Sequence, residues 1–116
     1  MSYIKIYENA AKFPSFEIVE LPEELNAWLN ACYKLLNCNS IEIVPSVLRG
    51  IVLVIDEEGK LKDGWLSRTN QIATQLYRNS HYDVITGDAI LARVDGENLV
   101  PLTTEDIKRL KKFYTF

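Results

Sequence analysis

The sequence predicts a single α+β domain, with a mixed or mostly antiparallel sheet of about six strands packed with three helices. Short apolar or alternating segments predict the strands, and three stretches with apolar residues at helical spacing predict the helices. The length of 116 residues, with 47% hydrophobic and 25% charged residues, is that of one ordinary globular domain.

Short apolar segments bounded by Pro, Gly, Asn or Asp predict the strands. They cover residues 3–7, 16–21, 40–44, 50–55, 89–94 and 99–102, with 84–85 leading into the fifth. The β-branched run at 50–55 predicts the central strand of the sheet, covered on both faces. Gly59 predicts a turn with positive φ, after which residues 60–62 are expected to return as a short strand.

The first predicted helix carries a stripe of Leu, Trp and Cys that indicates a buried face. Its members are Leu25, Trp28, Leu29, Cys32, Leu35 and Leu36. Pro22 is expected in the first turn of this helix, and the asparagines at 37 and 39 favour its end.

Two shorter helices follow nearer the C-terminus. The first covers about residues 70–78 and is expected to start from a cap at Ser67 or Thr69. The second covers about 105–113, where Thr103 and Asp106 have the spacing of a capping box.

Charge is unevenly distributed along the chain. Residues 1–58 hold four basic and nine acidic residues, and residues 59–116 hold nine basic and seven acidic ones. The net charge is −3 and the pI is about 5.1, which is not typical of a nucleic-acid-binding protein. Cys32 and Cys38 are expected to be reduced thiols, and one histidine with two cysteines does not make a zinc site.

No cofactor, metal or membrane partner is expected. The apolar runs are shorter than the roughly 18 residues of a membrane span, and the alternating start does not have the pattern of a secretory signal. We therefore expect a cytoplasmic protein. The acidic segment 56–58 is best interpreted as a solvated turn, and a divalent cation held there together with Asp88 is the alternative.

Standard catalytic motifs are absent from the sequence: there is no nucleophile elbow, Walker loop or Gly-x-Gly-x-x-Gly. His81, the single histidine, has Asp83 two residues away as a possible orienting carboxylate. An isolated loop histidine is more often a solvated surface residue, so no catalytic residue is assigned.

Three groups of polar or aromatic residues are candidate binding sites. Glu42, Asn70, Arg78 and Asp88 form the first, a ligand cleft between helix and sheet, although the alternation of its strand most simply places Glu42 towards solvent. Trp65 with Arg68 is the second, an anchor for a protein partner, and the alternative is that Trp65 covers the edge of the core.

The third group is the lysine face of the last helix. Lys108, Lys111 and Lys112 lie on one side of it and suit contact with nucleic-acid phosphates. Lysines near a helix C-terminus are also favoured by the helix dipole alone.

Several short segments between residues 40 and 112 resemble the domain of unknown function numbered 3846, in order along the chain. They are Ile-Glu-Ile-Val at 41–44, the strand 52–55 running into Asp-Glu-Glu-Gly-Lys, Asn70 with Ala73, Ile-Thr-Gly-Asp at 85–88, and Leu-Thr-Thr-Glu-Asp at 102–106. The N-terminal 39 residues add nothing to this resemblance. It implies a phage or mobile-element setting and residence in the host cytoplasm, and no reaction.

Together these observations predict a non-enzymatic binding protein that acts on a host protein, for instance as an inhibitor of a defence system. A protein that binds or sequesters a nucleotide-type ligand is the first alternative. A nucleic-acid-binding accessory protein is the second.

Overall fold

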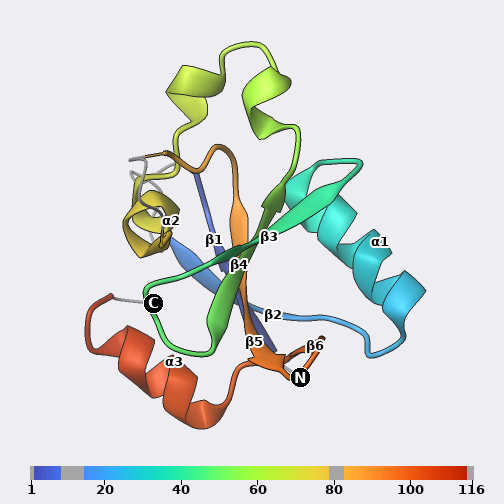
Figure 1. Ribbon diagram of the computed structural model, residues 1–116, viewed down its shortest axis with the longest axis vertical. Helices are drawn as coiled ribbons and strands as arrows, with labels where there is room; N and C mark the ends of the chain where they lie inside the picture. Colours follow the sequence, from blue (N-terminus) through green and yellow to red (C-terminus); the bar gives the residue numbers. More distant parts are fainter. Residues whose placement is uncertain (1, 9–14, 79–82, 115–116) are drawn as a thin grey trace.

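Six strands form one sheet in the computed structural model, which describes residues 2–8, 15–78 and 83–114 (Figure 1). The strand order is β2 (Phe16–Glu20), β1 (Ser2–Ile6), β5 (Ala89–Asp95), β4 (Ile51–Asp56), β3 (Ile41–Pro45). The sixth strand, β6 (Asn98–Val100), pairs with the end of β5. Every pairing among the described strands is antiparallel, which confirms the predicted α+β class.

Helices cover both faces of the sheet. Helix α1 (Leu25–Leu36) packs on one face, and α2 (Gln71–Leu76) and α3 (Thr104–Lys111) pack on the other (Figure 1). Two 3₁₀ turns, η1 (Gly59–Leu61) and η2 (Trp65–Arg68), project together beyond one end of the sheet.

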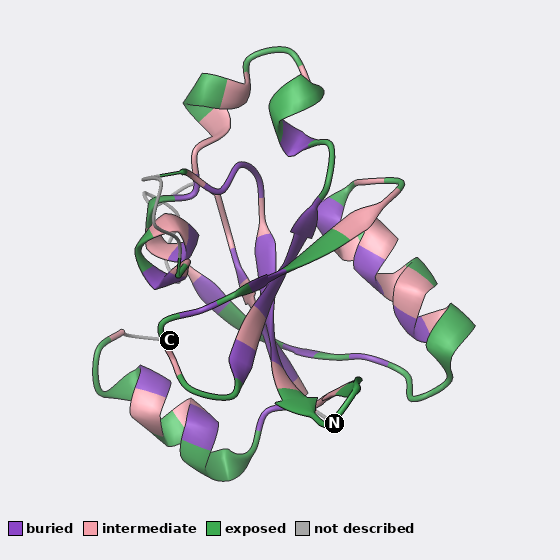
Figure 2. Ribbon diagram, viewed as in Figure 1, coloured by how far each residue is buried: buried purple, intermediate pink, exposed green. Residues whose placement is uncertain are grey.

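The core therefore has two layers, one on each side of the sheet. Trp28, Cys32 and Leu36 of α1 pack against Val54 and Ile90 in the first layer. The second layer contains residues of α2 and α3 with the opposite side chains of β4 and β5, namely Ala73, Leu76, Leu110, Leu53 and Leu91. Figure 2 shows the buried residues concentrated along these two strands. Burial on both faces explains why each strand is a nearly continuous apolar run.

The start of α1 differs from the prediction. Glu24 is its N-cap, and the Glu24 carboxylate accepts hydrogen bonds from the backbone N–H groups of Asn26 and Ala27. Pro22 therefore precedes the helix instead of lying in its first turn. Leu25 was predicted to be buried but is 67% exposed, because the first turn of α1 reaches past the core. Asn37 ends the helix with φ 51°, as predicted.

The starts of α2 and α3 depend on polar side chains. Asn70, and not Ser67 or Thr69, caps α2 by accepting a hydrogen bond from the Ala73 N–H. The capping box between Thr103 and Asp106 at the start of α3 is confirmed.

Two predictions about the middle of the chain are wrong. Gly59 has no positive φ, and residues 60–62 do not form a strand, because the chain turns into η1 at Gly59. A Cβ on Gly59 would lie 3.2 Å from the Thr86 carbonyl oxygen, so this glycine is needed for close approach. A third prediction is wrong only in part: β5, which lies between β1 and β4, is the central strand, but β4 is covered on both faces as predicted.

None of the helices in the described part of the chain is long and apolar enough to span a bilayer.

Candidate functional site

Asn70 is a structural residue at the centre of the molecule. Its side chain is fully buried, and its amide nitrogen donates to the carbonyl oxygens of Ile6 (3.2 Å) and Gly87 (3.0 Å). Its amide oxygen accepts from the Ala73 N–H at 3.0 Å. Asn70 thus joins β1, the start of β5 and α2, and its hydrogen bonds are made within the protein.

The other members of the predicted ligand cleft lie apart from Asn70 and from each other. Glu42 is exposed on the sheet face that carries α2 and α3, the same face as its strand neighbour Val44. The Asp88 carboxylate accepts from the Glu8 N–H at 2.7 Å and lies 3.4 Å from Lys5 Nζ, on the opposite face. Arg78 is exposed beyond the end of α2. The structure therefore does not bring these four side chains into one cleft.

The predicted protein anchor lies on the projecting 3₁₀ turns. Trp65 in η2 is half-buried, and Leu61 and Leu66 beside it are 81% and 72% exposed. The Arg68 guanidinium binds the Glu8 carboxylate, with Nε 3.0 Å from Oε2. Arg68 thus fastens η2 to the chain that follows β1.

The remaining candidates are placed as follows. Lys108, Lys111 and Lys112 are all exposed on α3, as predicted. His81 lies outside the described residues, and Asp83 forms an ion pair with Lys60.

In the acidic turn at the end of β4, the carboxylate of Asp56 is bound by groups of the protein itself. The Asp56 carboxylate is buried, lies 2.7 Å from Lys62 Nζ and accepts from the Glu58 N–H at 2.9 Å. Within the described ranges, no three acidic, cysteine or histidine side chains converge as a metal site.

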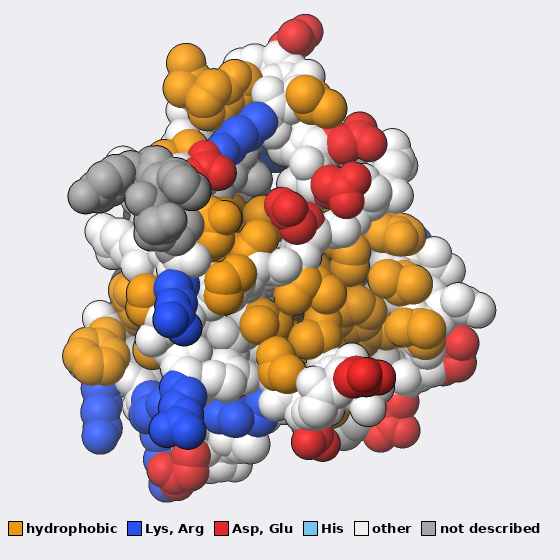
Figure 3. Space-filling view, viewed as in Figure 1, with side chains coloured by type: hydrophobic (Ala, Val, Ile, Leu, Met, Phe, Trp, Pro, Cys, Tyr) orange, Lys and Arg blue, Asp and Glu red, His pale blue; other side chains and the backbone are white. Residues whose placement is uncertain are grey.

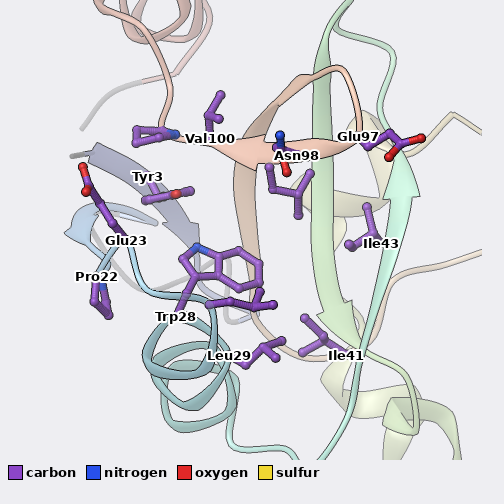
Figure 4. A pocket seen from close by; sticks show the side chains of 13 residues that line it. Tyr3, Pro22, Glu23, Trp28, Leu29, Ile41, Ile43, Glu97, Asn98 and Val100 are labelled. Carbon is purple, nitrogen blue, oxygen red and sulfur yellow. The ribbon is translucent and has the colours of Figure 1, made fainter.

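The strongest candidate site is a groove that the sequence reasoning missed. This α1 groove, of about 620 Å³, lies between α1, β3 and β6. Its apolar walls include Leu25 and Leu29 of α1 and Ile41 and Ile43 of β3 (Figure 4). It exists because α1 covers only part of its sheet face, which leaves Ile43 49% exposed at the edge strand. Figure 3 shows the resulting apolar patch beside α1.

Trp28 forms part of the apolar floor of this groove. The side chain is only 7% exposed, and its buried indole N–H has no hydrogen-bond partner within the described residues. The Trp28 ring lies 6.4 Å from the Tyr3 ring, centroid to centroid, and its nitrogen is on the side facing Tyr3 (Figure 4). Burial raises the pKa of the Tyr3 hydroxyl above its usual value, and the nearby Trp28 N–H partly opposes this rise. A buried donor without an acceptor costs about 1–3 kcal/mol, which a ligand in the groove does not offset while the indole nitrogen stays buried.

The charged residues that line the groove are both acidic. Glu23 lies just before α1, and Glu97 lies in the turn between β5 and β6. Figure 4 shows their carboxylates at opposite ends of the groove. The site thus combines an apolar floor with a negative charge at each end.

Fold and groove define this molecule as a small antiparallel α+β domain with an open apolar groove. The chain belongs to the family described as Domain of unknown function (DUF3846), whose family model matches residues 10–115. This confirms the resemblance and extends it towards the N-terminus, so that β2 and α1 fall within the matched range. No curated protein and no solved structure matches the chain.

Proposed function

We propose that this chain is a non-enzymatic binding protein whose α1 groove holds a segment of a partner protein. The partner segment carries apolar side chains that cover Ile43 and Leu25. Lysine or arginine residues on either side of it pair with Glu23 and Glu97.

The uncovered apolar sheet face is the observation that carries this proposal. Ile43 on this sheet face and Leu25 at the start of α1 are both exposed at the rim of the groove. A partner that extends past the groove would cover both side chains. Contiguous apolar surface of this kind is characteristic of protein interaction sites. The acidic ends favour a segment with positive charge at both ends over a compact uncharged ligand.

We further propose a setting that follows from the family resemblance. The protein is of phage or mobile-element origin, resides in the host cytoplasm and acts on a host protein, for instance by inhibiting a defence system. In that setting, binding alone is sufficient to block a host activity.

Selection of peptides from a random library on the immobilised protein tests the groove directly. We expect the enriched peptides to combine apolar residues with Lys or Arg. The Ile43→Glu substitution places a charge in the apolar groove and should weaken their binding at least about tenfold. Ile18→Glu is the matched control, because Ile18 is also on an edge strand and is 45% exposed, against 49% for Ile43.

Equal loss of binding in both variants would contradict the proposal. If only Trp65→Ala loses peptide binding, the partner contacts η2, the protein anchor predicted from the sequence, and not the α1 groove. The same three variants, used as baits in a lysate of the host, then show whether a captured host protein depends on Ile43.

A further inference from the structure

Basic residues gather on one face of this acidic protein. The chain holds 13 basic and 16 acidic residues, yet seven of the basic ones lie on or beside α3 and the β3–β4 loop. This basic face consists of Arg49, Arg78, Arg93, Lys108, Arg109, Lys111 and Lys112. Only two acidic residues, Glu105 and Asp106, lie on α3 or line the hollows beside it. In Figure 3 the blue side chains collect over α3 and the neighbouring loop.

Two adjoining hollows connect the arginines. One, of about 450 Å³, is lined by Arg49, Gly50, Arg93 and Arg109. The other, of about 490 Å³, is lined by Arg49, Gly50 and Arg78 together with mostly apolar residues of β3, β4 and the loop between them. Both contain Arg49 and Gly50, so the two hollows meet at the β3–β4 loop.

Asp106 holds two of these arginines in fixed positions. Its buried carboxylate accepts from Arg93 Nε at 2.7 Å, from Arg93 Nη2, and from Arg109 Nη2 at 3.0 Å. Each guanidinium carries five N–H donors, so donors on both arginines remain for a ligand. The two side chains are 29% and 43% exposed, which leaves them accessible from the first hollow.

The outer part of the face has unpaired charge and an exposed aromatic ring. Within the part of the chain that the structure describes, Arg49 and Arg78 have no acidic partner. Phe113 follows Lys112 at the end of α3 and is 76% exposed. Cationic grooves next to exposed aromatic side chains are the usual design of sites for single-stranded nucleic acid.

We propose that the basic face binds single-stranded nucleic acid, with the arginines and lysines on its phosphates and Phe113 stacked on a base. Arginine favours this ligand, because its planar guanidinium makes bidentate contacts with phosphate oxygens. A membrane surface fits less well, because Ile107 and Leu110 of α3 pack against the sheet and cannot enter a bilayer. The α1 groove shares no lining residue with either hollow, so the two sites can be tested separately.

Fluorescence anisotropy with a labelled oligothymidylate of about 20 nucleotides tests the proposal. We expect binding at about 50 mM salt that weakens with salt, with a log–log slope of about −0.7 for each phosphate contacted. Arg49→Gln with Arg78→Gln removes two exposed charges and should make the slope shallower by about 1.4. The control is Lys34→Gln with Lys60→Gln, which removes the same charge elsewhere and should leave the slope unchanged.

A Phe113→Ala variant distinguishes single strands from duplexes. Loss of one stacked base should weaken the single-stranded complex at least about fivefold and leave duplex binding unchanged. Equal weakening of both, or of neither, would overturn the single-strand assignment.

Competitors of other chemistry complete the test. Polyglutamate and phosphatidylserine vesicles, at equal concentrations of negative charge, should displace the oligonucleotide poorly. The proposal fails if either competes as well as unlabelled oligonucleotide, if anisotropy does not change at low salt, or if both double variants alter the slope equally.

Discussion

Gly50 leaves the space that the guanidinium of Arg93 occupies. A Cβ on Gly50 would lie 2.7 Å from Arg93 Nη1, closer than a Cβ atom approaches a non-bonded nitrogen. Gly50 also has φ 78°, a conformation that favours glycine. The β3–β4 loop and the Arg93–Asp106 pair therefore depend on each other.

Gly50→Ala should destabilise the protein by about 2 kcal/mol, combining backbone strain with displacement of Arg93. Gly96→Ala is the matched control: Gly96 has φ 62°, but a Cβ there would meet nothing within 4 Å. Chemical denaturation of both variants isolates the contribution of the Arg93 contact. Equal losses would show that Arg93 moves aside without cost.

Asp106→Asn should lower the free energy of unfolding by about 3 kcal/mol at neutral pH, because it leaves two arginines without their buried partner. The hydrogen bond from Arg93, aided by those from Thr103, holds the pKa of Asp106 below its usual range. Its stabilising effect is thus present above the ordinary aspartate pKa of about 3.9 and is lost as pH falls further. The variant should therefore lose less stability than the wild type on acidification. Glu105→Gln, at an 81% exposed neighbour, should change little at any pH.

Asn70→Ala should destabilise the protein by about 2–4 kcal/mol, since the buried carbonyl oxygens of Ile6 and Gly87 lose their donors and α2 loses its cap. Asn30→Ala, on the exposed side of α1, should be neutral or slightly stabilising. Thermal unfolding monitored by circular dichroism measures both. A small loss of stability in Asn70→Ala would mean that water takes over the hydrogen bonds of the amide without a cost in free energy.

The thiols should differ in reactivity. Burial raises the pKa of Cys32 to about 12 and also raises that of Cys38, which is half-buried. At about pH 8, Ellman's reagent should modify Cys38 slowly and Cys32 only after unfolding. Because the unfolded chain loses these protons near pH 8.5 and the folded chain keeps them, stability should fall as pH rises above that value. Rapid reaction of Cys32 in the native protein would contradict this burial.

Local patterns predicted most of the secondary structure of this chain. The spacing of Trp28, Cys32 and Leu36 gave the buried face of α1, and Thr103 with Asp106 gave the start of α3. Each of these signals lies within a few residues. The place of β5 at the centre of the sheet, by contrast, depends on pairing with β1 and β4, which no local pattern encodes.

The candidate site was less predictable for the same reason. An asparagine before a helix has the same sequence pattern whether it caps the helix or faces a ligand. The structural role of Asn70 follows from its hydrogen bonds to the carbonyl groups of Ile6 and Gly87, and both residues are distant from it in sequence. The α1 groove depends on how much of β3 the helix covers. Ile41 and Ile43 predict a buried strand face equally well whether or not α1 extends over them.

Trp28→Phe should leave the free energy of unfolding within about 1 kcal/mol of the wild type, although it removes part of a buried ring. The smaller ring loses packing, but the substitution also removes a buried N–H that has no acceptor among the described residues, and these two effects oppose each other. Trp28→Ala removes the ring altogether and should cost about 3–5 kcal/mol. Peptides selected for the groove should bind Trp28→Phe about as well as the wild type, because the indole nitrogen is buried beneath the groove. A stability loss above about 2 kcal/mol in Trp28→Phe would contradict the absence of an acceptor, since it would show that the indole N–H is satisfied in the folded protein.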